Sequence, residues 1–524
     1  MSKNLYLGIE LGSTRIKSVL IGQTHEPVAI GNHNWENRLV NGIWTYSLED
    51  IWQGLQASYS ALAADYEKKH NEKLTQVSGI GISAMMHGYI PLDAKGQLLT
   101  EFRTWRNTNT EAASKVLTPL FNHNIPLRWC IAHLYQAILN GEEHVCEIAT
   151  ITTLAGYIHY KLTGQNVLGV GDASGAFPID SKTCDYHKGN VEAFDALVSE
   201  NGYAWKLAAI LPKVLPAGYD AGQLSLEGAK LLDPSGNLTP GAPFCAPEGD
   251  AGTGMVATNS VAPGTGNVSA GTSIFAMLVL EEELSKLYPA IDMVTTPDGK
   301  PVAMVHCNNG TSDLNAWVQL FHEAISAVTN TSPQIEDVYK SLYQSALTGD
   351  ADGGGLTAVN YLSGEHNTGF EEGRPLFVRL PDARFTLANF MRTHLFAAMA
   401  TLKLGMDILA EEEKVKLTKL MGHGGLFATK GVAQKLMAGA LNIPVAVTET
   451  ANEGGAWGIA ILAAYTAGQT GISLAEYLNK YVFVSLPEVI VEPDHHDTAG
   501  FETFMERFAA GLKIERAAVD NYKM

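Results

Sequence analysis

The chain is poor in cysteine and in positive charge, and it contains no long hydrophobic run. Basic residues number 36 against 55 acidic ones, and the net charge of −19 argues against nucleic acid or an anionic membrane as the main partner. The longest apolar stretch, around residues 456–464, is too short to cross a bilayer. Only a short apolar strand follows Lys3 and Asn4, unlike a secretory signal peptide. We therefore expect a cytoplasmic protein that acts on a small molecule.

Sequence features that would indicate other protein classes are missing as well. The five cysteines form no C-x-x-C pair, which favours reduced thiols over a disulfide framework or a zinc site; they stand at positions 130, 146, 184, 245 and 307. No G-K-[ST] phosphate loop occurs, and the glycines of residues 169–175 lack the spacing of a dinucleotide-binding loop. Length and composition together predict a globular protein of two or more domains, because the chain has 524 residues, of which 46% are hydrophobic and 17% are charged.

A strand, a turn of glycine with two hydroxyl residues, and a return strand occur together twice. The first set covers residues 5–21 and carries Lys17 on its return strand; the second covers residues 267–280, about half the chain later. The two turns consist of Gly12, Ser13 and Thr14 and of Gly271, Thr272 and Ser273. Such turns can direct N–H groups and hydroxyls at one anion. We therefore predict a duplicated architecture in which a phosphate chain is clamped between the two halves.

Two carboxylates are candidate site residues, Glu10 beside the first turn and Asp250 near the middle of the chain. Glu10 falls on the face of its strand opposite the leucines, where a carboxylate can hold a nucleotide's Mg²⁺ through water. Asp250 lies among small residues, so a ligand could approach both its side chain and the adjoining backbone. Taken alone, an aspartate among small residues, such as Asp250, is more typical of a solvated or helix-capping side chain. In the same way, G-T-S alone is more often only a turn.

Several segments together are similar to the FGGY carbohydrate kinases, a family of the sugar kinase, Hsp70 and actin superfamily. These segments are Y-L-G-I-E-L-G-S-T-R-I-K-S-V-L at 6–20, G-D-A-G at 249–252, S-A-G-T-S at 269–273, Y-L-S-G-E at 361–365, M-G-H-G-G at 421–425 and E-G-G-A-W-G-I-A at 453–460. Each fragment is weak alone, but their order and spacing over some 460 residues are specific. The resemblance implies an α/β fold of two ribonuclease-H-like (actin-like ATPase) domains, with ATP and a sugar in the cleft between them.

The resemblance also implies roles for individual residues. Asp250 becomes the catalytic base, and M-H-G, as in xylulokinase-type members, places Met86 and His87 at the sugar. Trp105 and Arg106 align with a sugar-contacting W-N-D segment, from which Arg106 and Asn107 depart, so the sugar stays open. The implied ATP-binding residues are Gly12, Ser13, Thr14, Lys17, Gly271, Thr272, Ser273, Gly424 and Gly425. Glu10, with Asp250, would hold Mg²⁺, although the family usually has aspartate at position 10.

The domain boundary is expected near residue 258, because residues 259–266 have the composition of a linker. We predict an N-terminal domain, 1–258, with the sugar and the base, and a C-terminal domain, 259–524, with the nucleotide. Long helices are predicted after Ser47, which begins a capping box, and over residues 386–409. The segment Asp494-His-His-Asp497 has metal-ligating residue types, but adjacent residues seldom converge on one ion, so we predict no metal site there.

The leading hypothesis is an ATP-dependent kinase for a ketopentose, xylulose-like, or a related sugar or polyol. The glutamate at position 10 keeps a second class open, a sugar- or nucleotide-binding protein with little kinase activity. An Hsp70- or actin-like ATPase would share the fold but would not account for M-H-G and Trp105. The first half is expected to select the sugar, and a homodimer is compatible with the resemblance.

Overall fold

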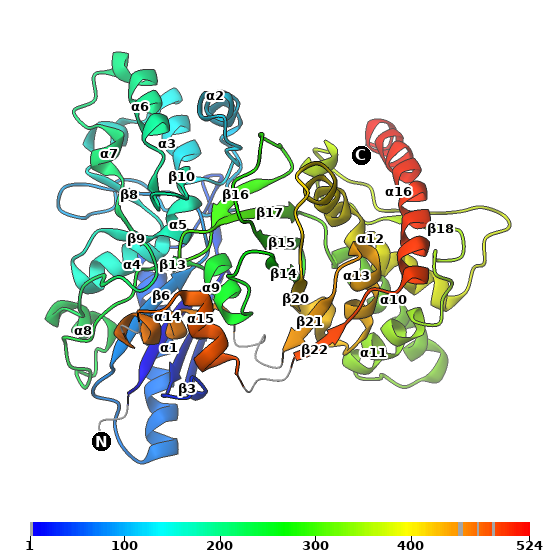
Figure 1. The fold of residues 1–524 in the computed structure, drawn as a ribbon, viewed down its shortest axis with the longest axis horizontal. Helices are drawn as coiled ribbons and strands as arrows, with labels where there is room; N and C mark the ends of the chain where they lie inside the picture. The colour runs from blue at the N-terminus through cyan, green and yellow to red at the C-terminus, as the bar shows by residue number, and fades with distance from the viewer. Residues whose placement is uncertain (1–3, 449–453, 469–470, 485–487, 524) are drawn as a thin grey trace.

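Two β-sheets form the centre of the protein, one in each half of the chain (Figure 1). The computed structural model describes residues 4–448, 454–468, 471–484 and 488–523. The first sheet has the order β13 (Glu248–Gly249), β6 (Gly79–Ala84), β1 (Tyr6–Leu11), β2 (Arg15–Ile21) and β3 (Pro27–Asn34). The second has the order β16 (Asp292–Thr295), β17 (Pro301–Cys307), β15 (Ile274–Val279), β14 (Thr265–Ala270), β20 (Lys419–His423), β21 (Val445–Thr448) and β22 (Glu488–Val491).

The two predicted hairpins are present, one in each sheet. Strands β1 and β2 are antiparallel and pair Glu10 with Lys17, and β14 and β15 pair Asn267 with Met277 in the same way. Strand β1 also runs parallel to β6, and β14 runs parallel to β20. Because parallel strands end at the same edge of a sheet, the turn after β1 and the loop after β6 lie together.

Helix α1 (Leu48–His70) confirms the predicted capped, amphipathic helix of the first half. The Ser47 hydroxyl accepts a hydrogen bond from the Asp50 N–H, which satisfies a donor that the first turn leaves free. Its buried face includes Leu55, Tyr59 and Leu62, which pack on the first sheet together with α4 (Leu154–Thr163) and α8 (Leu226–Leu232). The aromatic residues of this stripe are therefore core.

Helix α14 (Gly454–Gly468) comes from the end of the chain but packs on the opposite face of the first sheet, next to α9 (Asp250–Ala257). Glycines allow this close approach: a Cβ at Gly8 would lie 2.1 Å from the Ala456 carbonyl, and one at Gly458 would lie 2.1 Å from the Thr253 carbonyl. The sequence predicted such a small-residue helix over 453–464; residue 453 lies outside the described residues. The division of the chain at 258 stays a prediction.

The second sheet has a different neighbour on each face. Ile274, Ala276 and Leu278 of β15 point into a core formed with the helices of the second half, whereas Met277 and Val279 join the core of the first half. The helices are α10 (Ser312–Thr329), α11 (Ile335–Ala346), α12 (Leu387–Asp407), α13 (Val432–Leu441) and α16 (His495–Asn521). Helix α12 confirms the helix predicted over 386–409, with the Thr386 hydroxyl as its N-terminal cap.

Smaller elements complete both halves. In the first half the helices are α2 (Glu111–Phe121), α3 (Cys130–Leu139), α5 (Val170–Ser174), α6 (Lys188–Leu197) and α7 (Leu207–Ile210). Short strand pairs are β4 (Arg38–Val40) with β5 (Ile43–Thr45), β7 (Ile90–Leu92) with β8 (Thr150–Thr152), β9 (Val167–Gly169) with β12 (Lys213–Leu215), β10 (Ile179–Asp180) with β11 (Asp185–Tyr186), and β18 (Leu356–Val359) with β19 (Leu376–Arg379). The short helix α15 (Leu474–Tyr477) follows α14.

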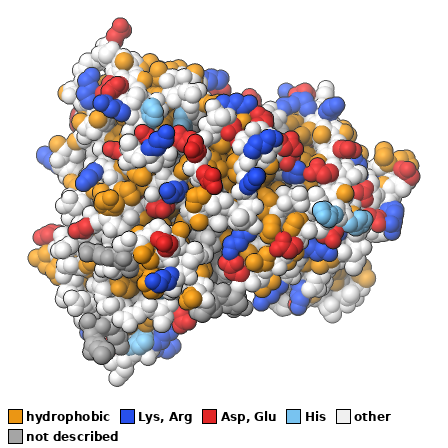
Figure 2. Space-filling view, in the orientation of Figure 1, with side chains coloured by type: hydrophobic (Ala, Val, Ile, Leu, Met, Phe, Trp, Pro, Cys, Tyr) orange, Lys and Arg blue, Asp and Glu red, His pale blue; other side chains and the backbone are white. Residues whose placement is uncertain are grey.

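The described surface shows no region of one charge in the view drawn in Figure 2, and the segment Asp494-His-His-Asp497 has a structural role. Figure 2 shows basic and acidic side chains interspersed over the visible face. No helix within the described ranges is long and apolar enough to cross a membrane. Asp494 caps α16 by accepting the His496 and Asp497 N–H groups, and Asp497 pairs with Arg392. The residues of this motif therefore stabilise the start of α16.

Candidate active site

Asp250 lies at the edge where the parallel strands of the first sheet end. Strand β13 ends at Gly249, and Asp250 is the first residue of α9. Its Oδ1 accepts the Met86 N–H at 3.2 Å, which ties it to the loop after β6. Burial raises the pKa of its carboxyl to about 6. A carboxylate with such a pKa is suited to accept a proton near neutral pH.

Glu10 occupies the neighbouring position at the end of β1. Its Oε2 accepts the Ala456 N–H from α14 at 3.2 Å, so the end of the chain helps to orient it. Gly455 leaves room for this contact, because a Cβ there would lie 2.6 Å from Oε1 of Glu10. Burial, and next the negative charge of Asp250, raise the pKa of Glu10 to about 7. The two carboxyls therefore repel each other when both are ionised, and a cation would relieve that repulsion.

The first glycine turn borders an open cavity of about 730 Å³. It is lined by Glu10, Gly12, Ser13, Thr14, Arg15 and Lys17, together with residues 34–36. The Gly12 N–H donates to the Arg15 carbonyl at 3.0 Å, and in the second turn the Gly271 N–H donates to the Ser273 carbonyl at 2.9 Å. These two N–H groups close their own turns. The hydroxyl residues of the turns are therefore better placed than the glycine N–H groups to meet a phosphate.

A second cavity, of about 500 Å³, lies between the two halves of the chain. It brings together the sequence-predicted residues Met86, His87, Trp105, Arg106 and Asp250 with Ser13, Thr272 and Ser273 from the two turns. The second half also contributes Phe275, Met304, His306, Asn308 and Ser363. Both halves therefore line this cavity, and the expectation that the first half by itself selects the sugar stays a prediction.

His87 is held in one orientation and one tautomer. Its backbone is left-handed, with φ of 68°, and it is followed by Gly88 at φ of 89°, so the chain turns sharply after β6. Its Nδ1 lies 2.9 Å from the Gly175 carbonyl, which can only accept, so Nδ1 carries the proton and Nε2 is an acceptor. Burial, and next the charge of Arg128, lower its pKa to about 3. The imidazole is thus neutral and can accept a hydrogen bond from a hydroxyl.

Gly175 makes that arrangement possible. A Cβ at this position would lie 2.6 Å from Cε of Met86 and 2.8 Å from Nδ1 of His87. The D-A-S-G stretch that ends here forms α5 and the turn after it. Asp172 of α5 is buried, accepts a hydrogen bond from the Thr153 hydroxyl, and has a pKa raised by burial to about 7.

The W-R-N segment divides into two roles. Trp105 is 37% exposed and donates from Nε1 to the Ser13 hydroxyl at 3.1 Å, which joins it to the first turn. The Arg106 guanidinium lies 3.8 Å from the Trp44 ring centre and donates to Asn37 at 2.9 Å. Asn107 is buried and bonds both the N–H and the carbonyl of Trp44. Trp105 and Arg106 line the cavity, whereas Asn107 fixes the β4–β5 hairpin.

Gly424 and Gly425 line neither of these two cavities. Gly424 has φ of 95°, and a Cβ there would lie 2.6 Å from the Ala270 carbonyl. Gly424 therefore packs against Ala270, the residue that precedes the second turn. They therefore lie at the edge of the second sheet that carries Thr272 and Ser273. Lys17 is buried and lines only the open cavity.

Sequence reasoning missed two further residues that line the cavity, Arg128 and His306. Arg128 lies just before α3 and pairs with Asp292 of the second half at 2.5 Å. His306 is the last residue but one of β17 and lines the cavity from the second half. Neither belongs to a recognisable motif, and only spatial proximity identifies them.

Glu10 and Asp250 are the carboxylates that the sequence assigned to Mg²⁺, and this assignment stays a prediction. No group of three or more metal-ligating side chains occurs among the residues that the structure describes, which leaves no all-protein cage there. Mg²⁺ bound with a nucleotide needs only one or two carboxylates, because waters and phosphates supply the other ligands. Glu10 lines the open cavity and Asp250 lines the cavity between the halves, and the charge of Asp250 acts on Glu10, so the two carboxyls could share such an ion.

Comparisons with known proteins identify a family and a fold for the chain. Residues 5–255 match the N-terminal domain of the FGGY family of carbohydrate kinases, and residues 266–467 match its C-terminal domain. The xylulose kinase of Haemophilus influenzae is 22% identical over 482 residues, covering 89% of this chain and 91% of that protein.

Solved structures match over nearly the whole length. A xylulose kinase from Lactobacillus acidophilus superposes with a TM-score of 0.81 at 17% identity, covering 99% of both chains. A gluconate kinase from the same organism gives a TM-score of 0.80 at 17% identity, again covering 99% of both chains. At such identities the likeness is one of fold, and it confirms the predicted α/β architecture of two actin-like ATPase domains.

Proposed function

Because the chain belongs to the FGGY family of carbohydrate kinases, we propose that it transfers phosphate from ATP to a hydroxyl of a ketopentose such as D-xylulose. The observation that carries this proposal is the cavity between the two halves. It contains a candidate base, Asp250, a neutral hydrogen-bond acceptor, His87, and the hydroxyls of both glycine turns. Base, sugar-binding groups and phosphate donors thus border one space, as direct phosphoryl transfer requires.

In the proposed reaction Asp250 accepts the proton of a sugar hydroxyl while that oxygen forms a bond to the γ-phosphorus of ATP. The bond from phosphorus to the bridging oxygen breaks, and ADP leaves with the electron pair. Ser13, Thr272 and Ser273 donate hydrogen bonds to the phosphate oxygens. Glu10 and Asp250 would hold Mg²⁺, which would supply positive charge to neutralise the phosphates. Residues 1–258 supply the base and most of the sugar contacts, and residues 259–524, with Gly424 and Gly425, bind the nucleotide.

The proposal is tested by ATP turnover in the pure protein with a panel of D-xylulose, D-ribulose, D-fructose, glycerol and D-gluconate. We expect a pentulose to stimulate ATP turnover most strongly, with a kcat of at least about 1 s⁻¹, within the usual range for enzymes. A protein that binds a sugar without stimulated turnover would support the binding-protein alternative. Turnover that ignores every sugar would support an actin-like ATPase instead.

Replacing His87 tests whether it contacts the sugar. A buried partner for a substrate hydroxyl is worth about 1–3 kcal/mol, because its loss leaves that hydroxyl unpaired in a closed site. His87→Ala should therefore raise KM for the best sugar by roughly 5- to 150-fold, with little change in KM for ATP. Steady-state kinetics with each substrate varied in turn measures both values.

His133 offers a matched control, since it is also a fully buried, neutral histidine of the first half but lies outside the cavity. His133→Ala should lower the melting temperature and leave the sugar KM unchanged. If His87→Ala behaves in this way as well, His87 is a structural residue and does not bind the sugar.

A further inference from the structure

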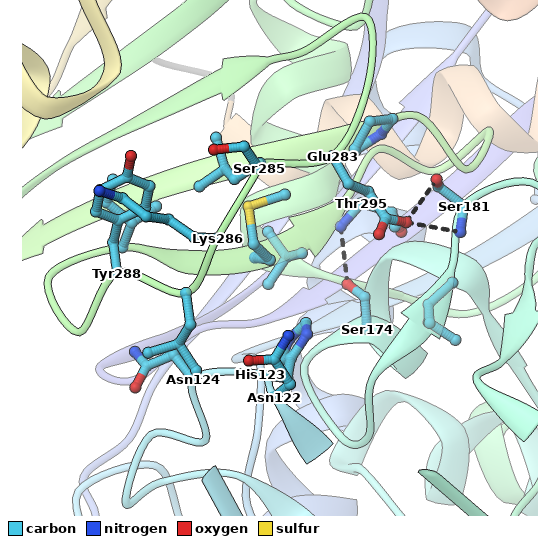
Figure 3. A pocket seen from close by; sticks show the side chains of 17 residues that line it. Asn122, His123, Asn124, Ser174, Ser181, Glu283, Ser285, Lys286, Tyr288 and Thr295 are labelled. Carbon is cyan, nitrogen blue, oxygen red and sulfur yellow. Dashed lines mark hydrogen bonds between the residues drawn. The ribbon is translucent and has the colours of Figure 1, made fainter. Parts of the chain in front are cut away.

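The two halves are joined by the hairpin β16–β17 and the loop before it, residues 281–307. Figure 3 shows Glu283 facing Ser181 and Thr295 facing Ser174 across the junction. The Ser181 hydroxyl donates to Glu283 at 2.7 Å, and the Thr295 N–H donates to the Ser174 hydroxyl at 3.0 Å. A cavity of about 160 Å³ between these contacts holds none of the predicted site residues. This hairpin is therefore anchored on the first half along its length.

Asp292, the first residue of β16, connects this hairpin to a residue that lines the proposed sugar cavity. It is 6% exposed, and its Oδ2 lies 2.5 Å from Nη2 of Arg128, while its Oδ1 accepts from Asn124 at 2.7 Å. Arg128 itself lines the cavity. A guanidinium has five N–H donors, so donors remain for a ligand after the bond to Asp292. Asp292 thus both fixes this side chain and cancels its charge.

Because Asp292 neutralises Arg128, the positive and negative charges around the cavity are equal in number. Its charged lining residues are Arg106, Arg128 and Asp250, and its two histidines, His87 and His306, are neutral because burial lowers their pKa. With Asp292 cancelling Arg128, the charge of Arg106 is matched by that of Asp250. Asp292 already neutralises Arg128, so a sugar carboxylate would find no free positive charge there. It would instead be repelled by the carboxylates of Asp292 and Asp250.

We propose that the ion pair between Arg128 and Asp292 is a specificity element of the sugar site, which donates hydrogen bonds to sugar oxygens and selects neutral sugars over sugar acids. This inference rests on the proposed function, since it assigns the substrate class of the same cavity. Arg128 is the residue that contacts the sugar, and Asp292 is its positioning residue. The pair spans the two halves, so this contact is complete only when they are docked as they are here.

The test compares D-xylulose with D-xylonate, which has the same number of carbons but carries a carboxylate. Wild type should favour the ketose in kcat/KM. Asp292→Asn leaves the guanidinium charge uncompensated, so the preference should move towards xylonate by on the order of 10- to 100-fold. Arg128→Gln removes the cation and leaves the negative charge of Asp292 uncompensated. This variant should therefore have a lower kcat/KM for xylulose and a kcat/KM for xylonate that falls even further. Opposite shifts in the two variants cannot arise from a general loss of structure.

The conservative variant Asp292→Glu keeps the charge and should retain the wild-type preference even if its stability falls. Glu142→Gln is the matched control, because it breaks the ion pair with Arg103, which is in the first half and outside the cavity. It should leave the preference unchanged. Binding of both compounds is also measured by calorimetry without ATP, so that selectivity is read apart from turnover.

A wild type that prefers xylonate, or shifts of the same sign in Asp292→Asn and Arg128→Gln, would overturn this inference while leaving the kinase assignment intact. Absence of any sugar-stimulated turnover, with the calorimetric preference for xylulose retained and shifted as described, would overturn the kinase function alone. A protein that binds neither compound would overturn the inference as well.

Discussion

Asp250→Asn should lower kcat by on the order of 10²- to 10⁴-fold, because the amide cannot accept the proton of the sugar hydroxyl. The amide oxygen can still accept the Met86 N–H that now binds Oδ1 at 3.2 Å, so the loop after β6 should keep its position. ATP affinity should change little, since the variant keeps the turns that meet the phosphates. Steady-state kcat, together with nucleotide binding by calorimetry, measures both effects.

The same variant should be more stable than the wild type at neutral pH. Burial raises the pKa of the folded Asp250 carboxyl to about 6, above its ordinary value, so ionisation opposes folding. The wild type therefore loses stability relative to the variant as the pH rises from about 4 through 6. A tenfold change in an acid dissociation constant corresponds to about 1.4 kcal/mol, and because the side chain is partly exposed we expect a difference in unfolding free energy of about 1–2 kcal/mol above pH 6. Chemical denaturation of both proteins across this pH range measures the difference.

Asp195 supplies a control for both measurements. It is a partly buried carboxylate of the same half whose Oδ1 accepts the Leu207 N–H at 2.9 Å, away from the cavity. Asp195→Asn should keep the wild-type kcat. An Asp250→Asn protein that retains more than about half of the wild-type turnover would remove Asp250 from the role of base.

Glu10→Gln should weaken the enzyme through its magnesium dependence. Gln keeps an oxygen for the Ala456 N–H but loses the negative charge that, with Asp250, would attract Mg²⁺. We expect the Mg²⁺ concentration at half-maximal rate to rise, and kcat at limiting Mg²⁺ to fall, by on the order of 10- to 100-fold. Titration of Mg²⁺ at fixed ATP and sugar measures this dependence.

Glu10→Asp keeps the charge, and it should stay active because the carboxylate moves by only about 1.5 Å, a distance that one water can bridge. The Mg²⁺ titration of Glu10→Asp should therefore lie close to that of the wild type. An unchanged titration in Glu10→Gln would instead show that the metal is held by other groups.

The elements that the sequence predicted well depend on near neighbours. The alternation before Gly12 buries Leu7, Ile9 and Leu11 on one face of the sheet and places Glu10 on the opposite face, near the end of the strand. The spacing after Ser47 likewise defines a helix with one buried stripe. Both patterns repeat within a few residues, so the local sequence determines them.

Other features follow from contacts between distant parts of the chain. The Ala456 N–H that orients Glu10 is 446 residues away in sequence, and Arg128 and Asp292 are 164 residues apart. Asn107 illustrates the same limit: its place beside Trp105 and Arg106 suggested the sugar site, yet its amide is used by Trp44. Which polar group pairs with which is decided when the elements pack, because burial makes every unpaired donor or acceptor costly.

The sequence by itself thus determined the two strand–turn–strand units and the strand that carries Glu10, since these rest on local periodicity and on glycines that free the backbone, while the α/β class followed from the resemblance to a family. Only the tertiary structure decided that the cavity takes residues from both halves, that α14 returns to the first sheet, and that Asp292 compensates Arg128. The physical reason is that electrostatic balance and close packing depend on distances in space, and no pattern along the chain encodes those distances.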